Sequence, residues 1–260
     1  GQIISVIGAR GGCGTTSVSL IMAAMSAQKL KQPIAFVDSN PIDGSASLLL
    51  DLEPSHGFKE ALEKPDRLDD LFIERAGVKA TEHLHLFCAE EKMGEVVKYH
   101  EDAADRLLAL MRKEFDATFI DMPHLVNPMT AKMLRLSDHV ILLTDMTLQA
   151  LRDTMRMKEW MREQLKIEQM SVVANRVGHE KSHEVDANDF EKTIDGKLEY
   201  KLPYAPNTFM EITADLHILT KMDDEVMDAL LKLSKKALPA LAQLPEEEEK
   251  KDGKKKKQKK

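Results

Sequence analysis

The chain of 260 residues is poor in aromatic residues and in cysteine, and it has no long apolar run. One Trp and three Tyr are too few for the aromatic platforms on which single-stranded nucleic acids stack. Two cysteines, Cys13 and Cys88, provide no disulfide framework, so a reducing, cytoplasmic location is expected. No window approaches about eighteen uninterrupted apolar residues, which excludes a helix that spans a bilayer.

Acidic residues outnumber basic ones outside the C-terminal tail. The formal net charge is −7, and the last fifteen residues carry eight Lys against five acidic residues, so the rest of the chain carries −10. Such an acidic surface binds DNA poorly, and DNA is not an expected partner. Residues 245–260 have little apolar surface to bury, so a disordered Lys-rich tail is expected after one domain over residues 1–244.

The chain alternates short apolar runs with helical stretches. The apolar runs predict buried strands at residues 3–7, 34–37, 83–88, 117–120, 140–144 and 170–174. Helical spacing is found at residues 17–29, 103–115, 148–165 and 223–244, and Pro239 is expected to kink or cap the last helix. This alternation predicts a three-layer α/β fold, in which helices cover both faces of a mostly parallel sheet.

A glycine-rich turn, GARGGCGTTS at residues 8–17, lies between the first predicted strand and the first predicted helix. In this context the glycines let backbone N–H groups close on phosphate oxygens, and the start of the helix favours negative charge. Thr15 stands where such loops usually have Lys, whereas Thr16 keeps the hydroxyl that binds Mg²⁺. The candidate phosphate-binding residues are Arg10, Gly11, Gly12, Cys13, Gly14, Thr15, Thr16 and Ser17.

Polar residues also end several other predicted strands. Asp38, Asp121 and Asn175 each follow an apolar run directly. Carboxyl ends of parallel strands meet at one edge of a sheet, so we expect these side chains to lie near the glycine turn. Asp38, Asp121 and Asn175 are therefore candidate residues of a site at this edge, and Thr16 is the candidate direct metal ligand.

Together these motifs resemble the MinD/ParA ATPases, a P-loop family in which the loop typically reads Lys-Gly-Gly-x-Gly-Lys-Thr. The resemblance extends in the same order from residue 2 to about residue 240, so it implies the P-loop NTPase fold, ATP and Mg²⁺ as ligands, and a homodimer. It implies that Asp38 and Asp121 are candidate organisers of the metal ion and of water. It also implies that Asn175 and Arg176 belong to the stretch that recognises adenine, and that Pro203 begins the segment that closes the base pocket.

Three residues differ from the typical family pattern and restrict the resemblance to one branch of the family. Arg10 and Thr15 replace the two lysines of the loop, and Asn40 replaces the second Asp of the first switch region. The pattern is most similar to the CpaE/TadZ branch, which implies a role in localising and assembling Flp (Tad) pili, pilus or secretion proteins as partners, and a place at the inner membrane or the cell pole. Many members of that branch carry a receiver-like domain before the ATPase-like domain. We expect that such a domain is missing here, because the sequence begins directly with a predicted strand.

The departures also bear on chemistry. Loss of one charged donor at position 15 weakens phosphate binding by about 1.5–3 kcal/mol, and Asn40 has no carboxylate to serve as a base. We therefore expect ATP binding with slow or absent hydrolysis. Three alternatives stay open: an active ATPase that uses Arg10, a scaffold without nucleotide, and a DNA-partitioning protein.

Each candidate residue also has a simpler structural explanation. The loop glycines are also suited to close packing, and Thr16 to an N-cap of the helix. Asp38, Asp121 and Asn175 are common at turns. Arg10 can be a solvated charge, and Cys13 is expected to fill space rather than to act as a redox switch.

Overall fold

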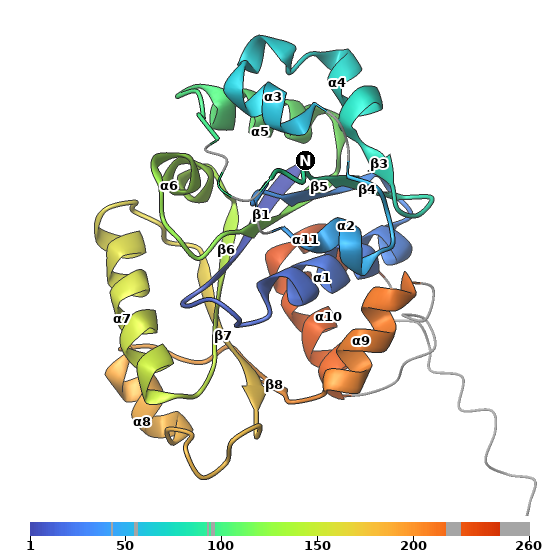
Figure 1. Ribbon diagram of the computed structural model, residues 1–260. Helices are drawn as coiled ribbons and strands as arrows, with labels where there is room; N and C mark the ends of the chain where they lie inside the picture. The colour runs from blue at the N-terminus through green and yellow to red at the C-terminus, as the bar shows by residue number, and fades with distance from the viewer. Residues whose placement is uncertain (43, 55–56, 93, 95–96, 217–224, 245–260) are drawn as a thin grey trace, which may run out of the picture.

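A computed structural model describes residues 1–42, 44–54, 57–92, 94, 97–216 and 225–244 (Figure 1). Within these residues one sheet of eight strands has the order β3-β4-β2-β5-β1-β6-β7-β8, and every neighbouring pair is parallel except β3 and β4. The strands are β1 Gln2–Gly8, β2 Ile34–Asp38, β3 Val78–Lys79, β4 Leu84–Phe87, β5 Ala117–Met122, β6 His139–Thr144, β7 Met170–Val177 and β8 Tyr200–Pro203.

Helices cover both faces of this sheet, which confirms the predicted fold class (Figure 1). One face packs against α1 Thr15–Leu30, α2 Ala46–Leu49, α9 Pro206–Ala214, α10 Glu225–Ala237 and α11 Pro239–Ala242. The other packs against α3 Phe58–Glu63, α4 Asp70–Ala76, α5 Ala103–Glu114, α6 Pro128–Arg135, α7 Leu148–Glu163 and α8 Ala187–Thr193. Among the described helices, none has the length and apolar character needed to cross a membrane.

Strand β1 lies at the centre and fixes where the site forms. Its side chains alternate between the two cores, with Ile3 and Ile7 on one face and Ile4 and Val6 on the other. The chain builds the sheet outward from β1 on both sides, because β5 and β2 follow on one side and β6 and β7 on the other. The carboxyl end of β1 is therefore a topological switch point, the usual place of a ligand site in such sheets.

The six predicted strands are confirmed, whereas β3 and β8 were not predicted because they are short edge strands with little apolar pattern. Helix α1 begins at Thr15, two residues before the predicted start, because Gly14 turns the chain directly into it. The predicted last helix is divided at Leu238, and Pro239 opens α11. The predicted tail, residues 245–260, lies outside the described residues.

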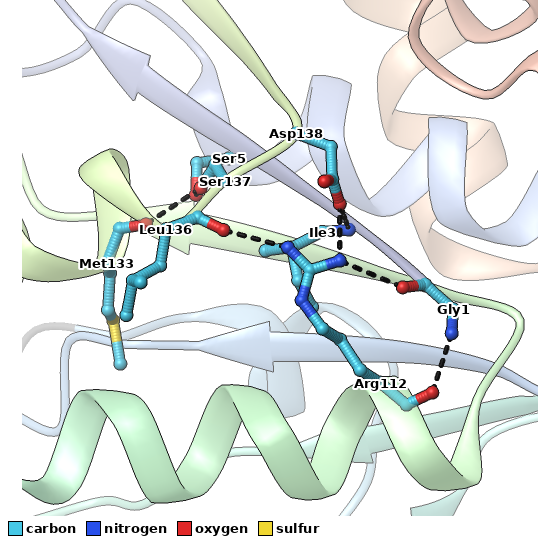
Figure 2. A network of polar contacts seen from close by, with 8 residues as sticks. All are labelled: Gly1, Ile3, Ser5, Arg112, Met133, Leu136, Ser137 and Asp138. Atoms are coloured by element: carbon cyan, nitrogen blue, oxygen red, sulfur yellow. Dashed lines mark hydrogen bonds and ion pairs between the residues drawn. The ribbon is translucent and has the colours of Figure 1, made fainter. Parts of the chain in front are cut away.

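At the opposite edge of the sheet, a polar network joins α5 to the start of β1 and of β6 (Figure 2). Arg112 donates from Nη1 to the carboxylate of Asp138 at 2.6 Å and to the carbonyl of Gly1 at 3.0 Å, and from Nη2 to the carbonyl of Leu136 at 2.9 Å. The same Asp138 oxygen accepts from the backbone N–H of Ile3 at 2.7 Å. This network fixes β1 at the end away from the glycine loop.

Candidate functional site

The glycine loop joins the carboxyl end of β1 to the first turn of α1. Gly12 and Gly14 have φ angles of 81° and 87°, in the region that favours glycine. Gly14 is the residue that precedes α1, and it has no side-chain cap. The open N–H groups of the first helical turn are thus available to an anion at the carboxyl edge of the sheet.

Asn175, at the end of β7, holds this loop from the side. Its Nδ2 donates to the carbonyl of Cys13 at 2.8 Å, and its Oδ1 accepts from the N–H of Arg176 at 2.9 Å. A Cβ at Gly14 would lie 2.7 Å from the same Nδ2, so only glycine fits at position 14. Asn175, a predicted adenine contact, is therefore bonded to the glycine loop itself.

Thr16 and Asp121 form a second contact, which joins α1 to the end of β5. The Thr16 hydroxyl donates to Asp121 Oδ2 at 2.6 Å. Burial and the negative charge of Asp38 raise the pKa of Asp121 to about 7, although hydrogen bonds from Thr16 and Thr15 act in the opposite direction. Its other oxygen, Oδ1, is buried and has no hydrogen-bond partner among the described residues. The Thr16 hydroxyl is thus occupied by Asp121, and Thr16 is not the N-cap of α1.

These residues fit a magnesium ion. A buried carboxylate with one unpaired oxygen, next to a hydroxyl, presents the hard oxygen atoms that Mg²⁺ prefers. Within the described residues, no three His, Cys, Asp or Glu side chains are grouped to hold a metal by themselves. An ion here needs further oxygens, and Mg²⁺ commonly takes them from phosphates and water.

Asp38 lies beside Asp121 in the sheet register, but its carboxylate also holds its own turn. Oδ1 accepts from the N–H of Asn40 at 3.1 Å, and Oδ2 accepts from the N–H of Ala46 at 3.3 Å. Burial raises the pKa of Asp38 despite these bonds. Asp38 is therefore placed both to hold the turn that follows β2 and to add negative charge next to Asp121.

A pocket of about 260 Å³ opens on the helix side of the glycine loop. It contains the predicted residues Asn175, Arg176 and Pro203 together with Gly14 and Ser17 of the loop. His179 and Tyr204 pack against each other in its wall, with ring centroids 4.2 Å apart. The sequence did not single out His179, or Phe209 and Met210 of α9, because nothing local marks them as neighbours of the loop.

The remaining loop residues have different surroundings. Arg10 donates from Nη1 to Gln149 Oε1 of α7 at 3.3 Å, so its guanidinium lies toward α7. Cys13 is 1% exposed, and burial raises the pKa of its thiol, which makes it a poor redox switch. His124, which no local pattern marks in the sequence, lies beside Gly11: a Cβ at position 11 would lie 3.4 Å from His124 Cε1.

Comparison with solved structures shows the same fold in nucleotide-dependent proteins. The chain aligns with the ParA family ATPase from Chlorobium tepidum TLS at a TM-score of 0.79 and 16% identity, over 90% of this chain and 98% of that one. The septum site-determining protein MinD from Pyrococcus horikoshii OT3, solved with Mg-ADP, gives 0.72 and 18% over 90% and 94%. An ATP complex of a McdA variant from Cyanothece gives 0.67 and 12% over 92% and 96%.

The sheet order, the glycine loop at its switch point and these alignments show the P-loop NTPase fold of the MinD/ParA ATPases. No curated protein sequence matches the chain. Residues 2–174 match the family model described as cellulose biosynthesis protein BcsQ, and the chain belongs to that family. The narrower resemblance to the CpaE/TadZ branch stays a prediction.

Proposed function

We propose that this chain binds ATP with Mg²⁺, with the phosphates in the glycine loop and the base in the pocket beside Tyr204. One observation carries the proposal: Gly14 and Ser17 line that pocket, while Thr16 between them contacts Asp121. A single helical turn thus touches the expected positions of the base, the phosphates and the metal. The Mg-ADP and ATP in the MinD and McdA structures support the same ligands here.

Hydrolysis is proposed to be slow or absent. Phosphoryl transfer depends on positive charge around the phosphates and on a group that positions the attacking water. Thr15 brings no charge to the loop, and Arg10 is engaged by Gln149. Asn40, in place of a carboxylate, accepts from the N–H of Ile42 at 3.4 Å. The site therefore favours a long-lived ATP state over turnover.

A homodimer around the nucleotides is the proposed active form. Exposed apolar side chains flank the loop on two sides: Leu125 and Val126 follow His124, and Leu148 precedes Gln149. Clustered apolar exposure next to a ligand site is typical of an interaction surface. In such a dimer we propose that Arg10 exchanges its bond to Gln149 for a contact with the nucleotide of the partner subunit, as the resemblance implies.

Dimer formation is tested by light scattering with ATP–Mg²⁺. Leu148→Glu places a charge on the proposed interface and is expected to keep the protein monomeric. Leu71→Glu, at another exposed leucine on the distant helix α4, is the matched control and is expected to leave the dimer intact. A dimer that survives Leu148→Glu would contradict this surface.

The proposed cellular role is to localise or assemble a machine of the cell envelope, with peripheral contact at the inner membrane or the pole. Family membership favours machinery for cellulose, and the loop sequence GARGGCGTTS favours Flp pili. Deletion in the source cell separates the two, because one predicts loss of cellulose and the other loss of pili.

Thermal shift and calorimetry test nucleotide binding directly. ATP–Mg²⁺ at about 100 times its Kd should stabilise the protein by about 2.7 kcal/mol. Thr16→Ala should abolish the magnesium-dependent part of the shift, whereas Thr193→Ala on α8 should not. Absence of any shift at millimolar ATP would favour the nucleotide-free scaffold. Fast phosphate release that is lost in Arg10→Ala would favour the active ATPase, and salt-dependent DNA binding would favour a partition protein.

A further inference from the structure

His124 lies beside the glycine loop, and none of the roles described above involves it. It follows Asp121 by three residues, in the loop between β5 and α6. Cε1, Nδ1 and Nε2 of its ring lie 3.4, 3.6 and 3.7 Å from the position that a Cβ would take at Gly11. These are ordinary van der Waals separations, so the imidazole lies beside the loop at Gly11.

The ring is both accessible and unpaired. His124 is exposed, and neither ring nitrogen has a hydrogen-bond partner among the described residues. The backbone is anchored on both sides: Pro123 follows β5, and Asn127 Oδ1 accepts from the N–H of Thr130 at 2.9 Å, which caps α6. An imidazole held in this way offers an N–H donor at the surface of the loop.

The position of the base pocket determines which phosphate reaches this donor. The pocket is lined by Gly14 and Ser17, at the helix end of the loop. A nucleotide with its base there extends its phosphates away from the pocket, along the loop toward Gly11. The phosphate farthest from the base therefore lies nearest to Gly11 and His124.

This is also where positive charge is missing. Thr15 carries no amine, and the Arg10 guanidinium is bonded to Gln149 on α7. A terminal phosphate has the highest charge of the three and gains most from a directed donor. Resting on the proposed nucleotide binding, we propose that His124 donates a hydrogen bond to the terminal phosphate of a bound nucleoside triphosphate, in place of the absent loop lysine.

The proposal predicts a difference between ATP and ADP. Removal of one such hydrogen bond in His124→Ala should weaken ATP–Mg²⁺ binding about tenfold, whereas ADP–Mg²⁺ binding should change less than about twofold. His124→Gln keeps an N–H donor of similar reach and should restore most of the ATP affinity. His83→Ala, at a half-exposed histidine that precedes β4 on the opposite edge of the sheet, is the matched control and should change neither.

Calorimetric titration of the four proteins with each nucleotide measures these constants, and thermal melting confirms that each variant is folded. An equal loss for ATP and ADP would show that His124 only shapes the loop, and it would overturn the proposal, as would unchanged ATP affinity. If the unmodified protein binds neither nucleotide, the proposed function itself fails. If it binds both and His124→Ala shows no selectivity, only the role of His124 fails.

Discussion

The hydroxyl of Thr16 donates to the carboxylate of Asp121 across 105 positions of the chain, at 2.6 Å. This bond joins the start of α1 to the end of β5, which is the strand next to β1 in the sheet. The carboxylate is buried beside a second acidic residue, Asp38, and no positively charged partner among the described residues balances it. The protein without ligand therefore carries an electrostatic cost at the place where a divalent cation is expected.

That cost predicts a pH dependence of stability. The pKa of Asp121 is raised from 3.8 to about 7 in the folded state, so the native protein holds a proton that the unfolded chain has released. The stability contributed by this proton is fully present below about pH 4 and is lost as the pH rises through about 7. Denaturant unfolding of the ligand-free protein should thus show falling stability across this window.

Asp121→Asn removes the titration and keeps an oxygen that can accept from Thr16. Between pH 5 and pH 8, the stability of this variant relative to the unmodified protein should rise by about 2 to 3 kcal/mol. Asp116→Asn, which changes an exposed carboxylate in the turn before β5, should give no such trend. The same slope in the unmodified protein and in Asp121→Asn would contradict the assignment.

Gly14 offers a test of the loop geometry. Alanine at this position meets two obstacles, because φ is 87° and the added Cβ would lie 2.7 Å from Asn175 Nδ2. Gly57 has a φ of 101° but nothing within 4 Å of its Cβ position. Gly57→Ala should cost about 1 to 2 kcal/mol of stability for the backbone alone, and Gly14→Ala at least about 1 kcal/mol more.

Urea denaturation measures both costs, and a double-mutant cycle locates the extra one. In an Asn175→Ala background the excess cost of Gly14→Ala should largely disappear, since the side chain that it would strike is gone. An excess cost that persists in that background would place the conflict elsewhere in the loop. Gly14→Ala should also prevent ATP binding, because Ser17 and Thr16 then shift with the helix start.

Arg112 provides a prediction about the opposite edge of the sheet. Its guanidinium joins the Asp138 carboxylate and two backbone carbonyls (Figure 2), so Arg112→Ala should lower stability by about 1 to 2 kcal/mol. Arg112→Lys keeps the charge but loses the planar fork, and should recover only part of this. Arg106→Ala breaks an exposed pair with Asp66 and should cost less than about 1 kcal/mol. Equal losses of stability for Arg112→Ala and Arg106→Ala in chemical denaturation would contradict this role of Arg112.

The sequence predicted the layers and the edge at which the site forms, because buried parallel strands have continuous apolar runs and end in polar residues. It did not predict contacts between distant segments. The bond from Asn175 to Cys13 spans 162 positions. The ring of His124 lies beside Gly11, which has no side chain from which a neighbour could be inferred. Arg10 was expected at a phosphate, and its bond to Gln149 depends on how α7 packs, which no local pattern encodes.

Thr15→Lys tests the consequence of the most unusual residue in the loop. If the missing amine is what limits phosphate binding, lysine at position 15 should strengthen ATP–Mg²⁺ binding by about 1.5 to 3 kcal/mol, or roughly ten- to a hundredfold. Thr193→Lys adds the same charge at an exposed position on α8 and should leave the affinity unchanged. Combined with Asn40→Asp, the new lysine should also raise phosphate release, since charge and a carboxylate are then both present. Calorimetry and a phosphate-release assay measure the two effects separately. Unchanged affinity in Thr15→Lys would mean that the backbone amides, the hydroxyls and His124 already neutralise the phosphates without an amine.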